Sequence, residues 1–322
     1  MVEKFGIGQP VPRTEDPRLL TGGGRYMDDN VLAGETRAYI LRSPFAHAKI
    51  NSIDTSAAKT SPGVLTVLTG ADYVADGFGI PECSPKRKRR DGSPMFEPVN
   101  RPLCLDEVRM VGDYVALVVA ETLEQAKDAA ELIEVDYEPL PSISTPYEAA
   151  QEGAPVVWPE AGNNICFVHQ AGDKAATEAG FAKADHIVRE MLPVNRSAHA
   201  TMEPRGVICD YDRRNGKWTV YTAVHYPWQV REELATKIFG VPENKFRVVC
   251  GDMGGSFGLR GGTYHEHILI PWASYRLGRP VKWVSDRSEG FMSDHHGRDV
   301  MWDGEIALDK DGMILAVRGT SY

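Results

Sequence analysis

A glycine-rich segment over residues 249–262 holds the residues best suited to chemistry, with the sequence Val-Cys-Gly-Asp-Met-Gly-Gly-Ser-Phe-Gly-Leu-Arg-Gly-Gly. Because they lack a β-carbon, Gly251, Gly254, Gly255 and Gly258 are expected to take positive φ and to expose their N–H groups. Such groups beside a helix start suit the oxygens of a phosphate, a pterin or an oxo-metal centre. No Lys-Ser/Thr pair follows, and the spacing G-x-G-x-x-G is not met, so neither phosphate-loop pattern applies. A turn that only lets a helix pack tightly on a sheet is the alternative.

The elements around this segment are predicted from apolar patterns. An apolar run over 246–249 predicts the strand that enters the loop, and residues 268–277 predict the helix that leaves it. A helix over about 227–239 precedes them. Further strands are expected over 185–192, 206–211, 217–222, 280–285, 301–308 and 313–322. The loop is therefore expected between a strand and a helix of an α+β domain.

The first half of the chain predicts a second compact α+β domain. Strands are expected over 36–42, 64–68 and 113–120, and Thr122 is expected to cap an amphipathic helix that runs to Ile133. Residues 81–99 interrupt the pattern with the basic run Lys86 to Arg90. This run predicts either a solvated loop or a nucleic-acid or localisation signal.

Proline and glycine positions divide the chain. We expect an extended arm for assembly over 1–20, an α+β domain over 21–147, a linker over 148–165 and a second domain over 166–322. The last residues read as a strand, which suggests a split gene or a piece of a longer protein.

Composition limits the function classes. The 322 residues are 42% hydrophobic, enough for ordinary buried cores, and a net charge of −9 argues against a nucleic-acid partner. No apolar run approaches about eighteen residues and no secretion signal is recognisable, so we expect a cytoplasmic protein without a membrane partner. The five cysteines are scattered without a C-x-x-C pair, which argues against a disulfide framework, a zinc site or an iron–sulfur cluster in this chain.

Motifs spread along the chain resemble the xanthine dehydrogenase and aldehyde oxidase family, in particular its bacterial large chains of the carbon monoxide dehydrogenase type. The first half is similar to the family's α/β-hammerhead domain through Arg13-Thr-Glu-Asp16, Thr21-Gly-Gly-Gly-Arg-Tyr-Met-Asp-Asp29, Leu41-Arg-Ser-Pro-Phe-Ala-His-Ala48, Pro62-Gly-Val64 and Val108-Arg-Met-Val-Gly-Asp-Tyr-Val-Ala116. The second half is similar to the first part of its molybdopterin-binding domain through Met202-Glu-Pro-Arg205, Gly251-Asp-Met-Gly-Gly-Ser-Phe-Gly258, Arg279-Pro-Val-Lys-Trp283, Asp286-Arg-Ser-Glu289 and His296-Gly-Arg-Asp299.

The resemblance implies a molybdenum hydroxylase that oxidises an aldehyde, an N-heterocycle or a related electron-poor carbon with oxygen from water. The implied cofactor is molybdopterin cytosine dinucleotide with molybdenum, which the pterin dithiolene holds without protein ligands. The implied partners are an FAD-binding subunit, a subunit with two [2Fe–2S] clusters, the chain that completes the molybdopterin domain, and a small-molecule substrate. The family's catalytic glutamate is expected outside these 322 residues. Part of a carbon monoxide dehydrogenase large chain, or an assembly fragment without metal, are the alternatives.

The resemblance also assigns site residues. Gly254, Gly255, Ser256, Phe257, Gly258 and Arg260 are expected to bind the cofactor, and Phe257 and His225 are expected at the catalytic centre. Main-chain N–H groups of the loop would approach the apical oxo ligand, with the Phe257 ring beside the centre. Plain core packing is the alternative for Phe257.

Two positions depart from the family pattern. His225 stands where the family commonly has a Gln that hydrogen-bonds the oxo ligand, so it either contacts that ligand or substrate or is a satisfied core histidine. Ser256 replaces a commoner Gly, which adds a hydroxyl and excludes a backbone conformation that only glycine adopts.

Other polar residues are expected to have structural or substrate-channel roles. His265 and His267 have the wrong spacing to ligate a metal from one helical face, and no third ligand is evident for a set that includes His295 and His296. We do not assign Glu203 or Glu266 as a general base.

Overall fold

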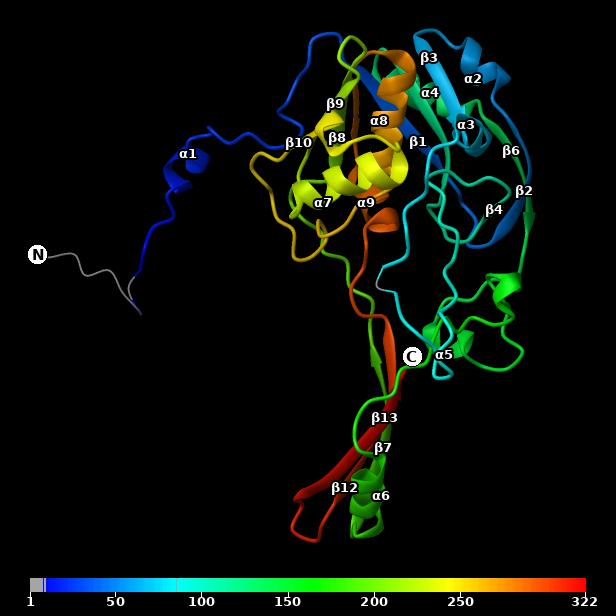
Figure 1. Ribbon diagram of the computed structural model, residues 1–322, viewed down its shortest axis with the longest axis vertical. Coiled ribbons are helices and arrows are strands. Elements are labelled where there is room, and N and C mark those ends of the chain that lie inside the picture. The colour runs from blue at the N-terminus through cyan, green and yellow to red at the C-terminus, as the bar shows by residue number, and fades with distance from the viewer. Residues whose placement is uncertain (1–7, 9, 85) are drawn as a thin grey trace, which may run out of the picture.

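The computed structural model describes residue 8, residues 10–84 and residues 86–322 (Figure 1). Residues 1–7 and 9 of the expected arm, and residue 85 of the interrupting segment, lie outside this description. Within the arm, α1 (Asp16–Leu20) is a short helix whose first turn contains Pro17, a position that proline tolerates. The expectation of an extended conformation over 1–20 is therefore wrong for residues 16–20.

A seven-stranded mixed sheet forms the centre of the molecule. Its strand order is β10 (Phe246–Val249), β9 (Lys217–Thr222), β8 (Gly206–Asp212), β11 (Val281–Val284), β1 (Thr36–Arg42), β5 (Tyr114–Ala120) and β3 (Val64–Thr69). The two halves of the chain meet where β1 pairs with β11 in parallel, with Thr36 opposite Val281. One sheet thus continues across both expected domains, and the domain boundaries stay a prediction.

Helices cover this sheet and explain its buried strands. Every residue of β5 is buried, which explains its uninterrupted apolar sequence. The helix α4 (Leu123–Glu131) packs on β1 and β5, and Thr122 and Gln125 form the capping box at its start, as the sequence predicted. The helix α8 (Glu266–Leu277) lies against β8 and β11, with Trp272 fully buried.

Shorter elements and a second sheet complete the fold. The predicted helix over 227–239 is α7 (Pro227–Glu232) followed by the π-helical turn η2 (Glu233–Ile238). A second sheet has the order β4 (Glu107–Val108), β2 (Ala48–Asp54) and β6 (Glu134–Pro139). The remaining short elements are α2 (Ser56–Thr60), α3 (Gly70–Asp76), α5 (Pro146–Ala149), η1 (Pro159–Ala161), η3 (Glu243–Lys245) and α9 (Arg287–Ser293).

The basic run lies in an exposed loop. Lys86 forms ion pairs of 3.6 Å with Glu82 and 3.5 Å with Glu97, and Lys88 bridges to Pro94. Both partners of Lys86 are exposed carboxylates of the same loop. The solvated-loop alternative is therefore the one that the structure supports.

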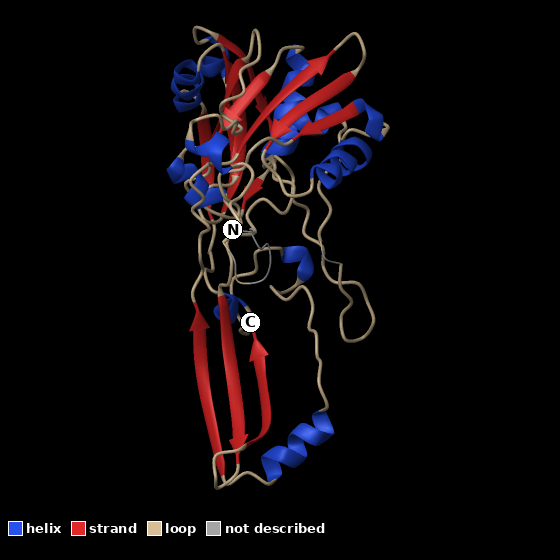
Figure 2. Ribbon diagram, turned by 90° about the vertical axis from the view of Figure 1, so that its left-hand side faces the viewer, coloured by secondary structure: helices blue, strands red, loops and turns tan. Residues whose placement is uncertain are grey.

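A third sheet stands apart from the central sheet (Figure 2). It has the order β13 (Ile314–Ser321), β12 (Val300–Leu308) and β7 (His186–Val194), all antiparallel, and α6 (Lys174–Ala182) packs on β13. The predicted strands over 185–192, 301–308 and 313–322 are these three strands, to within one or two residues at most ends.

Candidate cofactor site

The glycine loop follows β10 and precedes α8, and it exposes a row of main-chain donors. Among the residues that the structure describes, none accepts a hydrogen bond from the N–H groups of Gly255, Ser256, Phe257 or Gly258. Gly255 and Gly258 both have φ of +103°, as expected for glycines that turn the chain. Consecutive N–H groups of this kind form a concavity that binds anionic oxygens.

The other two glycines serve close packing, which corrects the expectation of positive φ for all four. Gly251 and Gly254 do not have positive φ. A β-carbon on Gly254 would lie 2.4 Å from the β-carbon of Glu203, and one on Gly251 would lie 2.8 Å from the main-chain oxygen of Arg25. These glycines therefore let two other segments of the chain reach the back of the loop.

Glu203 and Arg260 hold the loop from behind. Glu203 Oε2 accepts hydrogen bonds from Gly254 N at 2.8 Å and from Arg260 Nη2 at 2.9 Å. The Arg260 guanidinium also donates to the main-chain oxygens of Gly255 at 2.9 Å and Ala223 at 3.3 Å, and it is buried. Because its N–H groups face the protein, Arg260 is a positioning residue, and the expected direct contact between its side chain and a cofactor has no support in this geometry.

The N-terminal segment also packs on the loop. Asp252 pairs with Arg18 at 2.6 Å and accepts a hydrogen bond from Arg25 N at 2.7 Å, and Met27 N donates to Glu203 Oε1 at 2.9 Å. The Arg18 guanidinium holds the pKa of Asp252 well below its usual range. Arg18 of the expected assembly arm thus contacts its own chain. A cavity of about 200 Å³ lies between residues 25–30 and the loop.

Phe257 and His225 are both exposed at the loop, so neither side chain packs in the core that the described residues form. Phe257 is 78% exposed and has φ of +53°, a strained backbone for an aromatic residue. His225 N donates to Arg260 O at 3.0 Å, which fixes the backbone of His225 next to the loop. Strain that persists at an exposed aromatic residue is typical of functional sites.

Ser256 supports the loop internally. Its hydroxyl accepts a hydrogen bond from Arg260 N at 3.2 Å, and its side chain is buried. The side chain therefore does not project from the loop as Phe257 does. The positive φ that Ser256 avoids is taken by its neighbours Gly255 and Phe257.

Residues 199–201 complete the surroundings of the loop, and sequence reasoning missed them. His199 Nε2 lies 3.6 Å from the β-carbon position of Gly258, and Thr201 lies 3.5 Å from that of Gly255. The Nδ1 atom of His199 is buried without a hydrogen-bond partner in the described part of the chain. Ala200 between them has φ of +44°. Nothing in the local sequence signals this contact, because more than fifty residues separate the two segments.

A buried ion cluster anchors α8 behind the loop. Arg205 pairs with Glu266 and, at 2.7 Å, with Asp294, while Tyr114 Oη donates to Glu266 Oε2 at 2.8 Å. Burial alone would raise the pKa of Glu266, but Arg205 and His267 hold it below its usual value. Glu266 is therefore an ionised structural carboxylate that joins the two halves of the chain through β5.

Burial keeps the two neighbouring histidines neutral. Burial lowers the pKa of His265 to about 4 and that of His267 to about 4. His267 Nδ1 accepts a hydrogen bond from Tyr264 N at 2.9 Å, so protonation of that nitrogen would break the contact. In the described residues, no group of three or more His, Cys, Asp or Glu is arranged to hold a metal ion.

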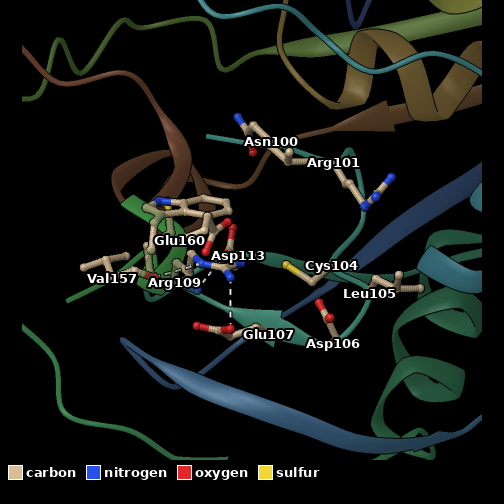
Figure 3. Close-up of a pocket in the computed structure, with 13 residues that line it drawn as sticks. Asn100, Arg101, Cys104, Leu105, Asp106, Glu107, Arg109, Asp113, Val157 and Glu160 are labelled. Atoms are coloured by element: carbon tan, nitrogen blue, oxygen red, sulfur yellow. Dashed lines mark hydrogen bonds and ion pairs between the residues drawn. The ribbon is translucent and has the colours of Figure 1, made fainter. Parts of the chain in front are cut away.

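A separate cavity of about 410 Å³ lies between the loop before β5 and residues 157–160 (Figure 3). Arg109 bonds Glu107 at 2.9 Å there and lies over the ring of Trp158. Burial raises the pKa of the Cys104 thiol, which keeps the sulfur protonated and weakly nucleophilic. None of the residues expected at the functional site lines this cavity. The glycine loop is therefore the stronger candidate site.

The fold places the glycine loop between β10 and α8, with main-chain donors that have no acceptor among the described residues. Residues 157–322 match the family model described as molybdopterin cofactor-binding domain, and residues 21–141 match the aldehyde oxidase and xanthine dehydrogenase a/b hammerhead domain. The chain belongs to the xanthine dehydrogenase and aldehyde oxidase family, as a molybdopterin-binding chain. The expected α+β fold, with its hammerhead and molybdopterin-binding parts, is confirmed.

Individual relatives agree with this assignment. The chain is 36% identical to the carbon monoxide dehydrogenase large chain of Afipia carboxidovorans, over 97% of this chain and 39% of that protein. It is 37% identical to the nicotine 6-hydroxylase large subunit of Paenarthrobacter nicotinovorans, over 97% of this chain and 37% of that protein. It superposes on quinoline 2-oxidoreductase from Pseudomonas putida 86 with a TM-score of 0.90 and 35% identity, over 99% of this chain and 39% of that structure. The chain thus spans about two fifths of the length of these relatives. No helix in the described residues is long and apolar enough to cross a membrane.

Proposed function

We propose that this chain is the cofactor-presenting part of a molybdenum hydroxylase that oxidises an electron-poor carbon. The observation that carries the proposal is the row of N–H groups from Gly255 to Gly258 that find no acceptor in the described part of the chain, within a segment that matches the molybdopterin cofactor-binding family model. A turn needed only for helix packing has no reason to leave four successive donors without acceptors. The donors fit an oxygen-rich, anionic group such as molybdopterin.

The residues of this chain bind and position that group. The N–H groups of residues 255–258 would bind its oxygens, while Glu203 and Arg260 keep the loop rigid from behind. The Phe257 ring would form one wall of the substrate-binding space. His225 would donate or accept one hydrogen bond at the edge of that space. When bound, the molybdenum cofactor supplies the two-electron oxidation, with water as the source of oxygen. We propose the cytosine dinucleotide form of the cofactor on the family resemblance.

An N-heterocycle is the substrate class that we favour. Two of the three relatives above are named for nicotine and quinoline, both N-heterocycles, and carbon monoxide oxidation is the second candidate because the third is named for it. An aldehyde belongs to the same reaction class. An FAD-binding subunit and a [2Fe–2S] subunit are proposed as partners, together with the polypeptide that completes the molybdopterin domain, in the cytoplasm.

The test is native mass spectrometry of the assembly that contains this chain, isolated from its own cells, with molybdenum and cytidine nucleotide quantified. We expect a heavier complex with near-stoichiometric molybdenum. A lone chain without metal would contradict the proposal and favour an assembly fragment. In the loaded complex, His225→Gln should alter the pH profile of substrate oxidation, and an unchanged profile would exclude a special role for the imidazole.

A further inference from the structure

The two faces of the sheet formed by β7, β12 and β13 differ in chemistry. Residues directly opposite each other in an antiparallel pair share a face. Trp302 is opposite Leu192 and Ser321, and Ile306 is opposite Val188 and Val317. These pairs define one face, called the Trp302 face, and the residues between them along each strand define the other, called the α6 face.

The α6 face is charged and partly covered. Arg189 pairs with Asp303 at 2.7 Å, and Arg318 pairs with Glu305 at 2.6 Å. The helix α6 lies on this side, because a β-carbon on its Gly180 would lie 2.7 Å from the Ala316 β-carbon. These contacts give the α6 face its own partners within the chain.

The Trp302 face is apolar, and several of its side chains are exposed. Its only acidic or basic side chain on β7 and β12, apart from His186 at the end of β7, is Glu190. Val188, Leu192, Val194 and Val317 are 45%, 52%, 43% and 54% exposed. The residues that make up its apolar surface are Val188, Leu192, Val194, Val300, Trp302, Ile306, Leu308 and Val317.

Two glycines keep this face open beneath the indole ring. A β-carbon on Gly304 would lie 2.1 Å from Trp302 Nε1, and one on Gly319 would lie 2.6 Å from the same ring. The ring therefore lies flat across β12 and β13. A cavity of about 830 Å³ continues the surface, lined by Trp302 and Gly319 together with the exposed Phe167 and Val168.

We propose that the Trp302 face binds the polypeptide that completes the molybdopterin-binding subunit. This inference rests on the proposed function for the identity of the occupant. A sheet with one apolar face must bury that face against another layer. This chain spans about two fifths of these relatives, so roughly three fifths of their length lies outside the part that it matches, which is ample to supply such a layer. Arg90 lines the adjoining cavity, but none of the strand residues on this face is Lys or Arg, which favours an apolar protein surface over an acidic partner or an anionic membrane.

The chain offers a matched pair of positions for the test. Leu192 is on the Trp302 face and Ile187 is on the α6 face of the same strand, and they are 52% and 54% exposed. A photo-crosslinking phenylalanine analogue is placed at one position or the other, the assembly is isolated from its own cells, and the captured peptides are sequenced. We expect Leu192 to capture molybdopterin-domain sequence from outside residues 1–322, whether on a separate chain or on a continuous one, and Ile187 to capture none.

Other outcomes overturn the inference. Capture of a second copy of residues 1–322, of a flavin or iron–sulfur subunit, or of nothing at Leu192 would each refute it. Molybdenum measured in the same sample separates this inference from the proposed function. A complex that contains molybdenum but gives no capture at Leu192 refutes only the binding role of the Trp302 face. Leu192→Asp should weaken the association by about tenfold or more and Ile187→Asp by less than about twofold, with melting temperatures of the isolated variants as the folding check.

Discussion

Replacement of Arg260 by Met tests whether this side chain holds the glycine loop. The change removes hydrogen bonds to the main-chain oxygens of Gly255 and Ala223 and leaves the Glu203 carboxylate, 9% exposed, without its cation. Breaking a buried ion pair by removing one partner costs about 3–5 kcal/mol of unfolding free energy. At roughly 2 °C per kcal/mol for a chain of this size, the melting temperature should fall by about 6–10 °C.

The matched control is Arg279→Met. Arg279 forms a two-bond ion pair with Glu121, at 2.7 and 2.9 Å, but both side chains are solvent-exposed. An exposed pair contributes less than about 1 kcal/mol. Thermal unfolding and urea midpoints give the stabilities, and hydrogen exchange should show faster exchange of loop amides only in the Arg260 variant. If both variants lost the same small amount of stability, the assignment of Arg260 as the residue that positions the loop would be refuted.

Three further changes test the loop and its surroundings. Gly254→Ala should cost about 1–3 kcal/mol of unfolding free energy, since its β-carbon would lie 2.4 Å from that of Glu203, whereas Gly262→Ala, with no atom within 4 Å, should stay within about 0.5 kcal/mol. Phe257→Asn should raise the free energy of unfolding, measured by urea denaturation, by about 1 kcal/mol, because Asn tolerates positive φ, while reducing substrate oxidation; lower stability would contradict the strain argument. The pKa of His267, lowered from 6.5 to about 4, makes the unfolded state bind more protons, so stability should fall as pH drops from 6.5 toward 4. His267→Gln should remove about 3 kcal/mol of this fall in unfolding free energy. If unfolding free energy depended on pH with the same slope in the variant and in the unmodified protein, the role of His267 would be refuted.

The sequence alone determined the local elements and the family. Apolar alternation and turn residues predicted the strands around the loop, and Thr122 predicted the cap of α4, because these features depend on residues close together in the chain. The family was identified from several short motifs that occur in a set order along the sequence. The glycine loop was found because glycine is needed wherever a backbone turns sharply or approaches another closely.

Only the tertiary structure decided what each loop residue does. Gly254 was expected to take positive φ, but it is a glycine because Glu203, fifty-one residues earlier, packs against it. Arg260 was expected to touch a cofactor, but its guanidinium bonds the loop backbone, and His199 reaches the loop from a segment without any motif of its own. Such roles depend on contacts between residues distant in sequence, which local patterns do not encode. The opposite characters of the two sheet faces followed from strand register for the same reason, because pairing across strands decides which side chains share a face.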